Sequence, residues 1–381
     1  MMACGRLRFS PRDQSGDGGA TTDSGSADAA VPICTTLGFV PGATLAAGNS
    51  PSAIATADLD GDGLLDLVVT NYNSLTLSVF LGQGAGAFST EHTYSVGNTA
   101  AASLVIADLN DDGQLDAAAC DANGGNVIVL LGTGGGALAA PVTYAVGMDP
   151  QTIAVADFNG DGKLDLAATS FASNSAAVLS NMGGGAFAVT ATLATQNNPT
   201  GIAAGDLDGD GKPDLVVTST NSSTMSVYIN NGTATFNTMP TVYATGSLPD
   251  RLAIADLDGD GKRDVVVANS NGNTLGVYLN MGGGMLTSPT TYATGMQPVA
   301  VAVGDLDRDG LVDLVVPEPM SGTVGVLRGI GGGAFAAREP YAAGTGPSSV
   351  ALGDFNGDGL LDIAVGDGSV TSVQLLLASC Q

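Results

Sequence analysis

The chain has 381 residues, and 37 acidic against 11 basic side chains give it a formal net charge of −26 at pH 7. So acidic a chain repels phosphate backbones, which argues against a nucleic-acid partner. Hydrophobic residues make up 44% of the sequence, enough for a packed core, and no stretch approaches the roughly 20 apolar residues that span a bilayer.

Two interpretations are open for the first residues. They lack the apolar region of a secretory signal peptide, yet Met2-Ala3-Cys4-Gly5 resembles the end of a bacterial lipoprotein signal, in which small residues precede a lipidated cysteine. Either the true start lies upstream and Cys4 carries a lipid anchor, or the chain begins with an ordinary disordered tail. In both cases we expect a disordered tail or tether at residues 1–31 and a folded domain at residues 32–381.

An acidic segment of nine residues recurs seven times, at intervals of 49 or 50 residues. The first copy reads DLDGDGLLD at Asp58–Asp66. An apolar stretch precedes it and a β-branched run follows it, and each is typical of a short strand. Two further short strands are predicted between that run and the next acidic segment. Four short strands in about 50 residues make one propeller blade. The sequence therefore predicts an all-β, seven-bladed β-propeller with four-stranded blades.

The two ends of the chain predict how the ring closes. The last repeat stops after its third strand, at Val373–Leu377, and the N-terminal residues Thr44–Asn49 match the fourth-strand pattern of Thr93–Asn98. We therefore expect the N-terminal strand to complete the last blade and to cover its open edge.

The cysteines agree with this closure. Cys34 precedes the N-terminal strand and Cys380 follows the last one, so we predict a disulfide between them, with two unpaired thiols as the alternative. The bond would imply an oxidising compartment and stabilise the fold by about 3–5 kcal/mol on the chain-entropy model. Cys120 lies in a predicted second strand, where we expect a buried, small hydrophobic side chain.

Each acidic segment has the donors that Ca²⁺ prefers, namely oxygen ligands from a flexible acidic loop. Positions 1, 3 and 5 carry carboxylate or carboxamide oxygens, position 7 would offer its backbone carbonyl, and the Asp at position 9 could bind with both oxygens. Position 6 is Gly in all seven copies, where the chain must turn sharply. The alternative is seven ordinary acidic turns. The predicted ligands of up to seven Ca²⁺ ions are, loop by loop, Asp58, Asp60, Asp62, Leu64 and Asp66; Asp108, Asn110, Asp112, Gln114 and Asp116; Asp157, Asn159, Asp161, Lys163 and Asp165; Asp206, Asp208, Asp210, Lys212 and Asp214; Asp256, Asp258, Asp260, Lys262 and Asp264; Asp305, Asp307, Asp309, Leu311 and Asp313; and Asp354, Asn356, Asp358, Leu360 and Asp362.

The seven loops are not equivalent. Asn replaces Asp at position 3 in three of them, as Asn110, Asn159 and Asn356, and we expect weaker binding there because one ligand charge is lost. Position 4 is Gly except for Asp111 and Arg308, where we expect a strained turn.

The loops and their spacing resemble the FG-GAP/VCBS repeats of the integrin α-subunit N-terminal propeller and of many bacterial surface proteins, over about residues 37–377. The calcium loops match closely, whereas repeat ends such as Gly86-Ala87-Phe88 match the family consensus only loosely. The resemblance implies a seven-bladed propeller with structural calcium on one face and partner recognition on the other.

The resemblance leads us to expect an extracellular or cell-surface binding or adhesion module with a protein or glycan ligand on a cell surface or matrix. If Cys4 carries the lipid anchor, the module would be an outer-membrane lipoprotein. We expect no enzyme, because the only histidine, His92, lies in a predicted strand and no catalytic motif accompanies it. A carbohydrate-binding lectin is the main alternative, although there is no Trp, and a polysaccharide-acting enzyme is the second.

Residues that depart from the repeat on the face opposite the calcium loops are candidates for the binding surface. Ordinary variation among surface loops is the alternative. These residues are Tyr72, Asp121, Phe171, Arg251 and Glu318.

Overall fold

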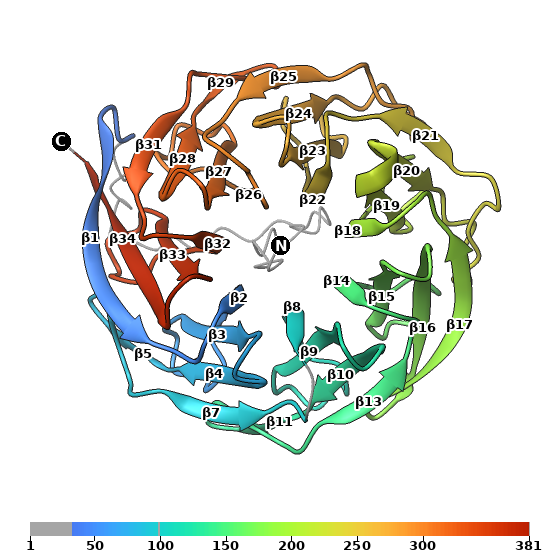
Figure 1. The fold of residues 1–381 in the computed structure, drawn as a ribbon, viewed down its shortest axis with the longest axis horizontal. Helices are drawn as coiled ribbons and strands as arrows, with labels where there is room; N and C mark the ends of the chain where they lie inside the picture. The colour runs from blue at the N-terminus through green and yellow to red at the C-terminus, as the bar shows by residue number, and fades with distance from the viewer. Residues whose placement is uncertain (1–32, 98–99, 381) are drawn as a thin grey trace, which may run out of the picture.

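The computed structural model describes residues 33–97 and 100–380, which form a closed ring of seven four-stranded antiparallel sheets (Figure 1). The predicted all-β, seven-bladed propeller is thus confirmed. The predicted tail at residues 1–31 and the proposed anchor Cys4 lie outside the described residues. No helix in the described part of the chain combines the length and the apolar character needed to cross a membrane.

In the first six blades, the four main strands follow one another from the central axis to the rim. Blades 1 to 3 contain β2 (Pro51–Ala57), β3 (Asp66–Asn71), β4 (Thr76–Phe80) and β7 (His92–Ser95); β8 (Ala101–Ala107), β9 (Asp116–Asp121), β10 (Asn126–Leu130) and β13 (Val142–Ala145); and β14 (Pro150–Ala156), β15 (Asp165–Ser170), β16 (Ser175–Gly183) and β17 (Ala186–Ala194). Blades 4 to 6 contain β18 (Pro199–Gly205), β19 (Asp214–Ser219), β20 (Thr224–Tyr228) and β21 (Thr241–Ala244); β22 (Pro249–Ala255), β23 (Asp264–Asn269), β24 (Thr274–Tyr278) and β25 (Thr290–Ala293); and β26 (Ala302–Gly304), β27 (Asp313–Glu318), β28 (Thr323–Leu327) and β31 (Glu339–Ala342).

Some blades have additional short hairpins or a 3-10 turn in the connections between their main strands. Hairpins between the third and fourth strands are formed by β5 (Gly82–Gly84) with β6 (Ala87–Phe88), β11 (Gly132–Gly134) with β12 (Ala137–Leu138), and β29 (Gly329–Gly331) with β30 (Ala334–Phe335). A 3-10 turn, η1 (Thr220–Ser222), joins the second and third strands of blade 4.

Blade 7 is assembled from both ends of the chain. It contains β32 (Pro347–Gly353), β33 (Asp362–Asp367), β34 (Ser372–Cys380) and, as its outer strand, β1 (Leu37–Ala46). Strand β1 pairs antiparallel with β34, from Leu37 opposite Cys380 to Ala46 opposite Ser372, and the two lie side by side in Figure 1. The predicted closure is confirmed, and so is the disulfide between Cys34 and Cys380, whose Cα atoms are 5.4 Å apart.

Hydrophobic side chains fill the space between neighbouring blades in seven clusters, one for each pair of adjacent blades. The second strands supply much of this core because both of their faces are covered, as in β3, where all six residues are buried. Cys120 has no exposed surface, and burial raises the pKa of its thiol, so the expected role as a small buried side chain is confirmed. Each blade therefore depends on both neighbours for its core, which explains why the ring has to close.

Candidate metal sites and the opposite face

The seven acidic loops share one face of the ring, because each joins the innermost strand of a blade to the second strand. Loop 1 shows how the backbone holds the side chains. The Asp58 carboxylate accepts hydrogen bonds from the backbone N–H groups of Gly61 (2.8 Å) and Gly63 (3.0 Å). Oδ1 of Asp60 accepts from Asp62 N–H, and Oδ1 of Asp62 accepts from Leu64 N–H. These bonds curl the loop so that its carboxylates point inward together.

Carboxylate oxygens converge in four of the loops, where three of them lie within 4.8 Å of one another. At that distance unscreened like charges repel by about 1–4 kcal/mol per pair at effective dielectrics of 80 to 20. Such a cluster is a candidate cation site. The clusters are Asp58, Asp60 and Asp62; Asp206, Asp208 and Asp210; Asp256, Asp258 and Asp260; and Asp305, Asp307 and Asp313.

The three loops with Asn at position 3 keep the same fold. The N–H group of each position-6 glycine donates to the Asp at position 1, at 2.8–2.9 Å, and the Asn Oδ1 accepts from the N–H of position 5. An amide oxygen therefore stands where the other loops have a carboxylate oxygen. Asn110 and Asn356 also donate from Nδ2 to Asp112 and Asp358. The prediction of weaker binding in these loops stays a prediction.

Backbone conformation at position 4 confirms the expected strain. Five loops have Gly there, with φ between 75° and 86°. Asp111 and Arg308 adopt a similar left-handed conformation, each with φ of 62°. A residue with a Cβ atom is disfavoured in this region, by roughly 1–2 kcal/mol. The fold thus requires a glycine-like turn even where the sequence does not supply glycine.

The Asp at position 9 has a structural role that the sequence did not reveal. Asp66 is fully buried, and its two oxygens accept backbone N–H groups of Leu59 and Gly82, each at 2.7 Å. All seven loops repeat this pattern, so the carboxylate joins its loop to the end of the third strand or to the residues just after it. Burial raises the pKa of Asp214, Asp313 and Asp362 to about 6, against the opposing effect of these hydrogen bonds. Of the position-9 residues, Asp313 alone belongs to a described carboxylate cluster, and the bidentate role stays a prediction for all seven.

Loop 6 is tied to the ring closure. The backbone N–H of Cys34 donates to the Asp307 carbonyl at 2.8 Å, and the Arg328 guanidinium lies 3.9 Å from the Asp307 carboxylate. The same arginine donates to the carbonyl of Leu37 in β1. Oδ1 of Asp305 is buried and has no hydrogen-bond partner among the described residues. A cation bound in loop 6 would supply the missing partner.

In loops 3, 4 and 5, a lysine side chain forms an ion pair with an aspartate of the same loop, a feature that the sequence analysis missed. At position 7, Lys163 and Lys212 place Nζ 3.0 and 2.6 Å from Oδ2 of Asp161 and Asp210, and Lys262 contacts Asp260 in the same way. The prediction considered only the backbone carbonyl at this position. A Lys two residues after an expected ligand was the available signal.

The structure contradicts part of the predicted surface patch on the opposite face, and the rest stays a prediction. Tyr72, Phe171 and Arg251 are partly exposed, but Asp121 and Glu318 are 1% and 0% exposed, so their assignment to a binding surface was wrong. Both end a second strand, where the chain is still enclosed by neighbouring blades. Asp121 accepts from the turn that follows it, and Glu318 pairs with Arg338 while accepting from the N–H of Gly295.

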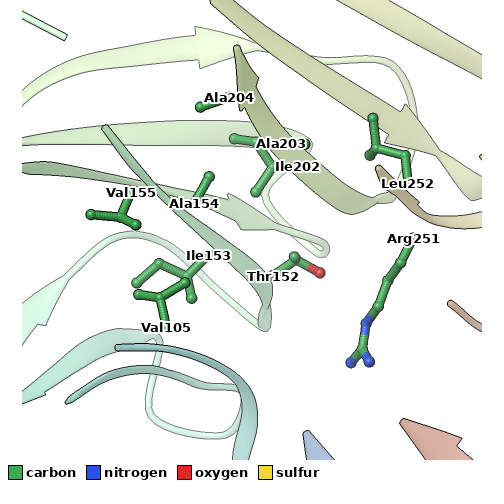
Figure 2. Close-up of a pocket in the computed structure, with 10 residues that line it drawn as sticks. All are labelled: Val105, Thr152, Ile153, Ala154, Val155, Ile202, Ala203, Ala204, Arg251 and Leu252. Atoms are coloured by element: carbon green, nitrogen blue, oxygen red, sulfur yellow. The ribbon is translucent and has the colours of Figure 1, made fainter. Parts of the chain in front are cut away.

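The same face carries the mouth of the central channel, a cavity of about 350 Å³. It is lined by residues at the beginnings of inner strands and in the neighbouring turns, including Tyr72, Gln151, Arg251 and Ser348. Figure 2 shows Arg251 together with the mostly apolar residues that line an adjoining space, among them Leu252, its neighbour in the chain, and Ile153, from which the guanidinium lies apart.

A model of the FG-GAP-like repeat matches most of the chain, in six overlapping or adjacent segments at residues 58–119, 108–168, 157–217, 206–267, 256–316 and 319–365. The chain belongs to the FG-GAP-like repeat family. The resemblance inferred from the acidic loops is thereby confirmed. No curated protein has significant sequence similarity to this FG-GAP-like chain.

Several solved structures have a similar fold. BBS1N, crystallised in complex with ARL6DN, has a TM-score of 0.63 at 13% identity, over 90% of this chain and 97% of its own. Virginiamycin B lyase from Staphylococcus aureus has a TM-score of 0.61 at 14% identity, over 90% and 99%. An Agrocybe aegerita lectin that recognises non-reducing terminal N-acetylglucosamine has a TM-score of 0.56 at 20% identity, over 86% and 85%. At these identities the similarity shows the fold alone.

Proposed function

We propose that this FG-GAP-like protein is a calcium-stabilised extracellular binding or adhesion propeller that recognises a protein or surface ligand through the face opposite the acidic loops. The observation that carries the proposal is the convergence of three carboxylate oxygens within 4.8 Å in four loops of a chain with a net charge of −26. Bound cations would relieve a repulsion that the fold otherwise has to overcome.

Calcium is the cation that these donors suit best. The loops offer carboxylate, carboxamide and backbone carbonyl oxygens and no nitrogen or sulfur ligand, which favours a hard cation. Ca²⁺ accepts irregular, flexible coordination, whereas Mg²⁺ requires a small octahedral site. Seven Ca²⁺ ions would change the net charge from −26 to about −12.

The division of the ring into two unlike faces supports the proposed location of the partner surface. The acidic loops repeat one structural pattern on one face, which leaves the opposite face free to differ from blade to blade. The disulfide between Cys34 and Cys380 supports an extracellular location, because such bonds persist in oxidising compartments.

Calcium titration of the full chain tests the first half of the proposal. We expect Ca²⁺ to raise the melting temperature strongly and calorimetry to count several bound ions, with Mg²⁺ at equal concentration having a much smaller effect. Asp208→Asn gives loop 4 the asparagine at position 3 that three other loops have. We expect it to weaken calcium binding at that one loop and so to reduce slightly the rise in melting temperature. An unchanged melting temperature after chelation would contradict the calcium role.

A matched pair of exposed methionines tests the binding face. Met320 lies in a turn of the opposite face and is 65% exposed, and Met281 lies on the acidic-loop face and is 60% exposed. We expect Met320→Glu to reduce binding of the calcium-loaded protein to cells or matrix, and Met281→Glu to leave it unchanged. The reverse pattern would place the partner on the acidic-loop face.

A lectin role is the second candidate. The partly exposed ring of Tyr72 lines a cavity together with serine and amide side chains, a mixture suited to a sugar. The similar fold of the Agrocybe aegerita lectin shows that a propeller of this size can serve in sugar recognition. Binding to a glycan array, abolished by Tyr72→Ala, would support this candidate over protein recognition.

A further inference from the structure

The mouth of the central channel combines a ligand-sized cavity with a positively charged side chain. Its volume of about 350 Å³ lies within the usual range of small-molecule pockets, roughly 300–1,000 Å³. Pro51 and Pro319 contribute apolar surface, and Tyr72, Gln151 and Arg251 contribute polar groups. The next space along the channel is only about 40 Å³ and is lined mostly by apolar side chains, so a ligand would be held at the mouth.

Arg251 is the positively charged group in this cavity. Its Nη2 donates to the carbonyl of Ala102 at 3.0 Å, which links blade 5 to blade 2 across the channel. Of the eight Lys and Arg residues in the described part of the chain, five form ion pairs, and Arg251 is not among them. Burial lowers the pKa of its guanidinium. The carboxylate of the neighbouring Asp250 attracts this guanidinium but forms no ion pair with it. A partly desolvated charge that lacks a close partner is costly, so an anion bound directly to the guanidinium would be stabilising.

The direction of the side chain suits an incoming ligand. Figure 2 shows the Arg251 side chain extending away from Leu252, with the guanidinium at its far end and apart from the apolar side chains of Val105 and Ile153. The planar guanidinium has further N–H donors beyond the one bonded to Ala102, in a fork that matches the two oxygens of a carboxylate.

We propose that Arg251 anchors the carboxylate of a small ligand in the mouth of the central channel. This inference rests on the proposed binding role of the face opposite the acidic loops. A single carboxylate fits better than a polyanion, because the chain carries a net charge of −26 and Asp250 lines the same cavity. The carboxylate has two possible sources, a uronic acid or the carboxyl group of a partner's peptide chain.

Calorimetric titration of the calcium-loaded full chain distinguishes these sources. Glucuronate is compared with glucose, and N-acetylglycine with its neutral amide, so that each pair differs mainly in the negative charge. We expect at least one carboxylate to bind about tenfold more tightly than its neutral counterpart, as a charge-assisted hydrogen-bonded pair implies. The carboxylate that binds identifies the source.

Four variants assign the binding to the site. Arg251→Gln should weaken carboxylate binding about tenfold or more, and Arg251→Lys should weaken it less, because a point charge replaces the planar fork. Asp250→Asn should strengthen binding, since it removes a negative charge from the cavity lining. Arg263→Gln, at an exposed arginine beside loop 5, should change nothing. Melting curves check that each variant is folded. If Arg251→Gln does not fold, carboxylate binding by Arg251→Lys and Asp250→Asn tests the proposal instead.

Three outcomes would overturn the proposal. One is that neither carboxylate binds to a folded protein that still responds to calcium, which would leave the proposed function standing. Another is that the neutral compounds, or inorganic phosphate, bind as tightly as the carboxylates. The third is that the Arg251 and Asp250 variants bind like the unchanged protein.

Discussion

The two faces of the ring are built from the same strands but differ in how strictly they repeat. On the acidic-loop face, all seven position-9 aspartates are buried and accept the same two backbone hydrogen bonds. On the opposite face, the corresponding buried residue at the end of the second strand changes from blade to blade. It is Asn71, Asp121, Ser170, Ser219, Asn269, Glu318 or Asp367.

The difference shows what each face has to satisfy. A carboxylate at position 9 accepts two N–H groups that no other described group satisfies, and a shorter or neutral side chain would leave one of them unpaired. At the end of the second strand, the partners differ between blades, and the buried Ser219 hydroxyl of blade 4 has none among the described residues. Asp367 accepts from Thr345 and Ser369, whereas Ser170 donates to the carbonyl of Val146. This position therefore holds a polar side chain in every blade but has no single hydrogen-bond pattern.

The largest expected effect tests the repeated face. Asp264→Ala removes the acceptor of the N–H groups of Leu257 and Asn280, at 2.8 and 2.7 Å. Each buried donor left unpaired costs about 1–3 kcal/mol, and relief of the buried charge offsets a part, so we expect a loss of about 2–4 kcal/mol in unfolding free energy. Chemical denaturation without calcium measures this apart from any loss of metal. Asp260→Ala, an exposed change in the same loop, is the control and should have a much smaller effect.

A smaller effect is expected on the opposite face. In blade 6, the buried residue at the end of the second strand pairs with an arginine, which no other described blade has at this position. Glu318 accepts from Gly295 N–H and Thr323 and pairs with Arg338. Glu318→Gln would keep the shape and remove the charge, and because Arg338 is partly exposed we expect a loss of about 1–3 kcal/mol. Glu339→Gln, whose side chain is half exposed, is the matched control. If Glu318→Gln cost as much as Asp264→Ala, the two faces would be equally demanding.

The sequence was sufficient wherever a feature repeats. Seven copies at intervals of 49 or 50 residues define the blades, and the missing fourth strand after Leu377 predicts both the closure and the disulfide between Cys34 and Cys380. Strand length was less accurate, since β1 begins at Leu37 whereas the matching pattern begins at Thr44. Pairing with β34 extends the strand beyond the repeat pattern.

The sequence was insufficient where contacts join residues that are far apart in the chain. Arg251 contacts Ala102, which lies 149 residues away in the sequence, and no local sequence pattern predicts this contact. Asp121 and Glu318 looked like loop residues because they differ from their equivalents in other repeats. Their shared position after a buried apolar run was the overlooked signal, because a polar residue of some kind stands there in every blade.

The smallest expected effect concerns differences within the repeated face. Lys262 holds Oδ2 of Asp260 in loop 5, an oxygen that an incoming Ca²⁺ would use. The pair is on the surface and contributes little to stability, but the ammonium group competes with calcium for the carboxylate. We expect Lys262→Leu to lower the calcium concentration that half-saturates loop 5 by a few-fold, with little change in stability. The amide resonance of Gly261, whose N–H donates to Asp256, reports on this loop in an NMR titration. Arg263→Leu removes an adjacent positive charge that forms no described ion pair, and an equal gain in affinity there would mean that general charge, and not the lysine contact, sets the difference between loops.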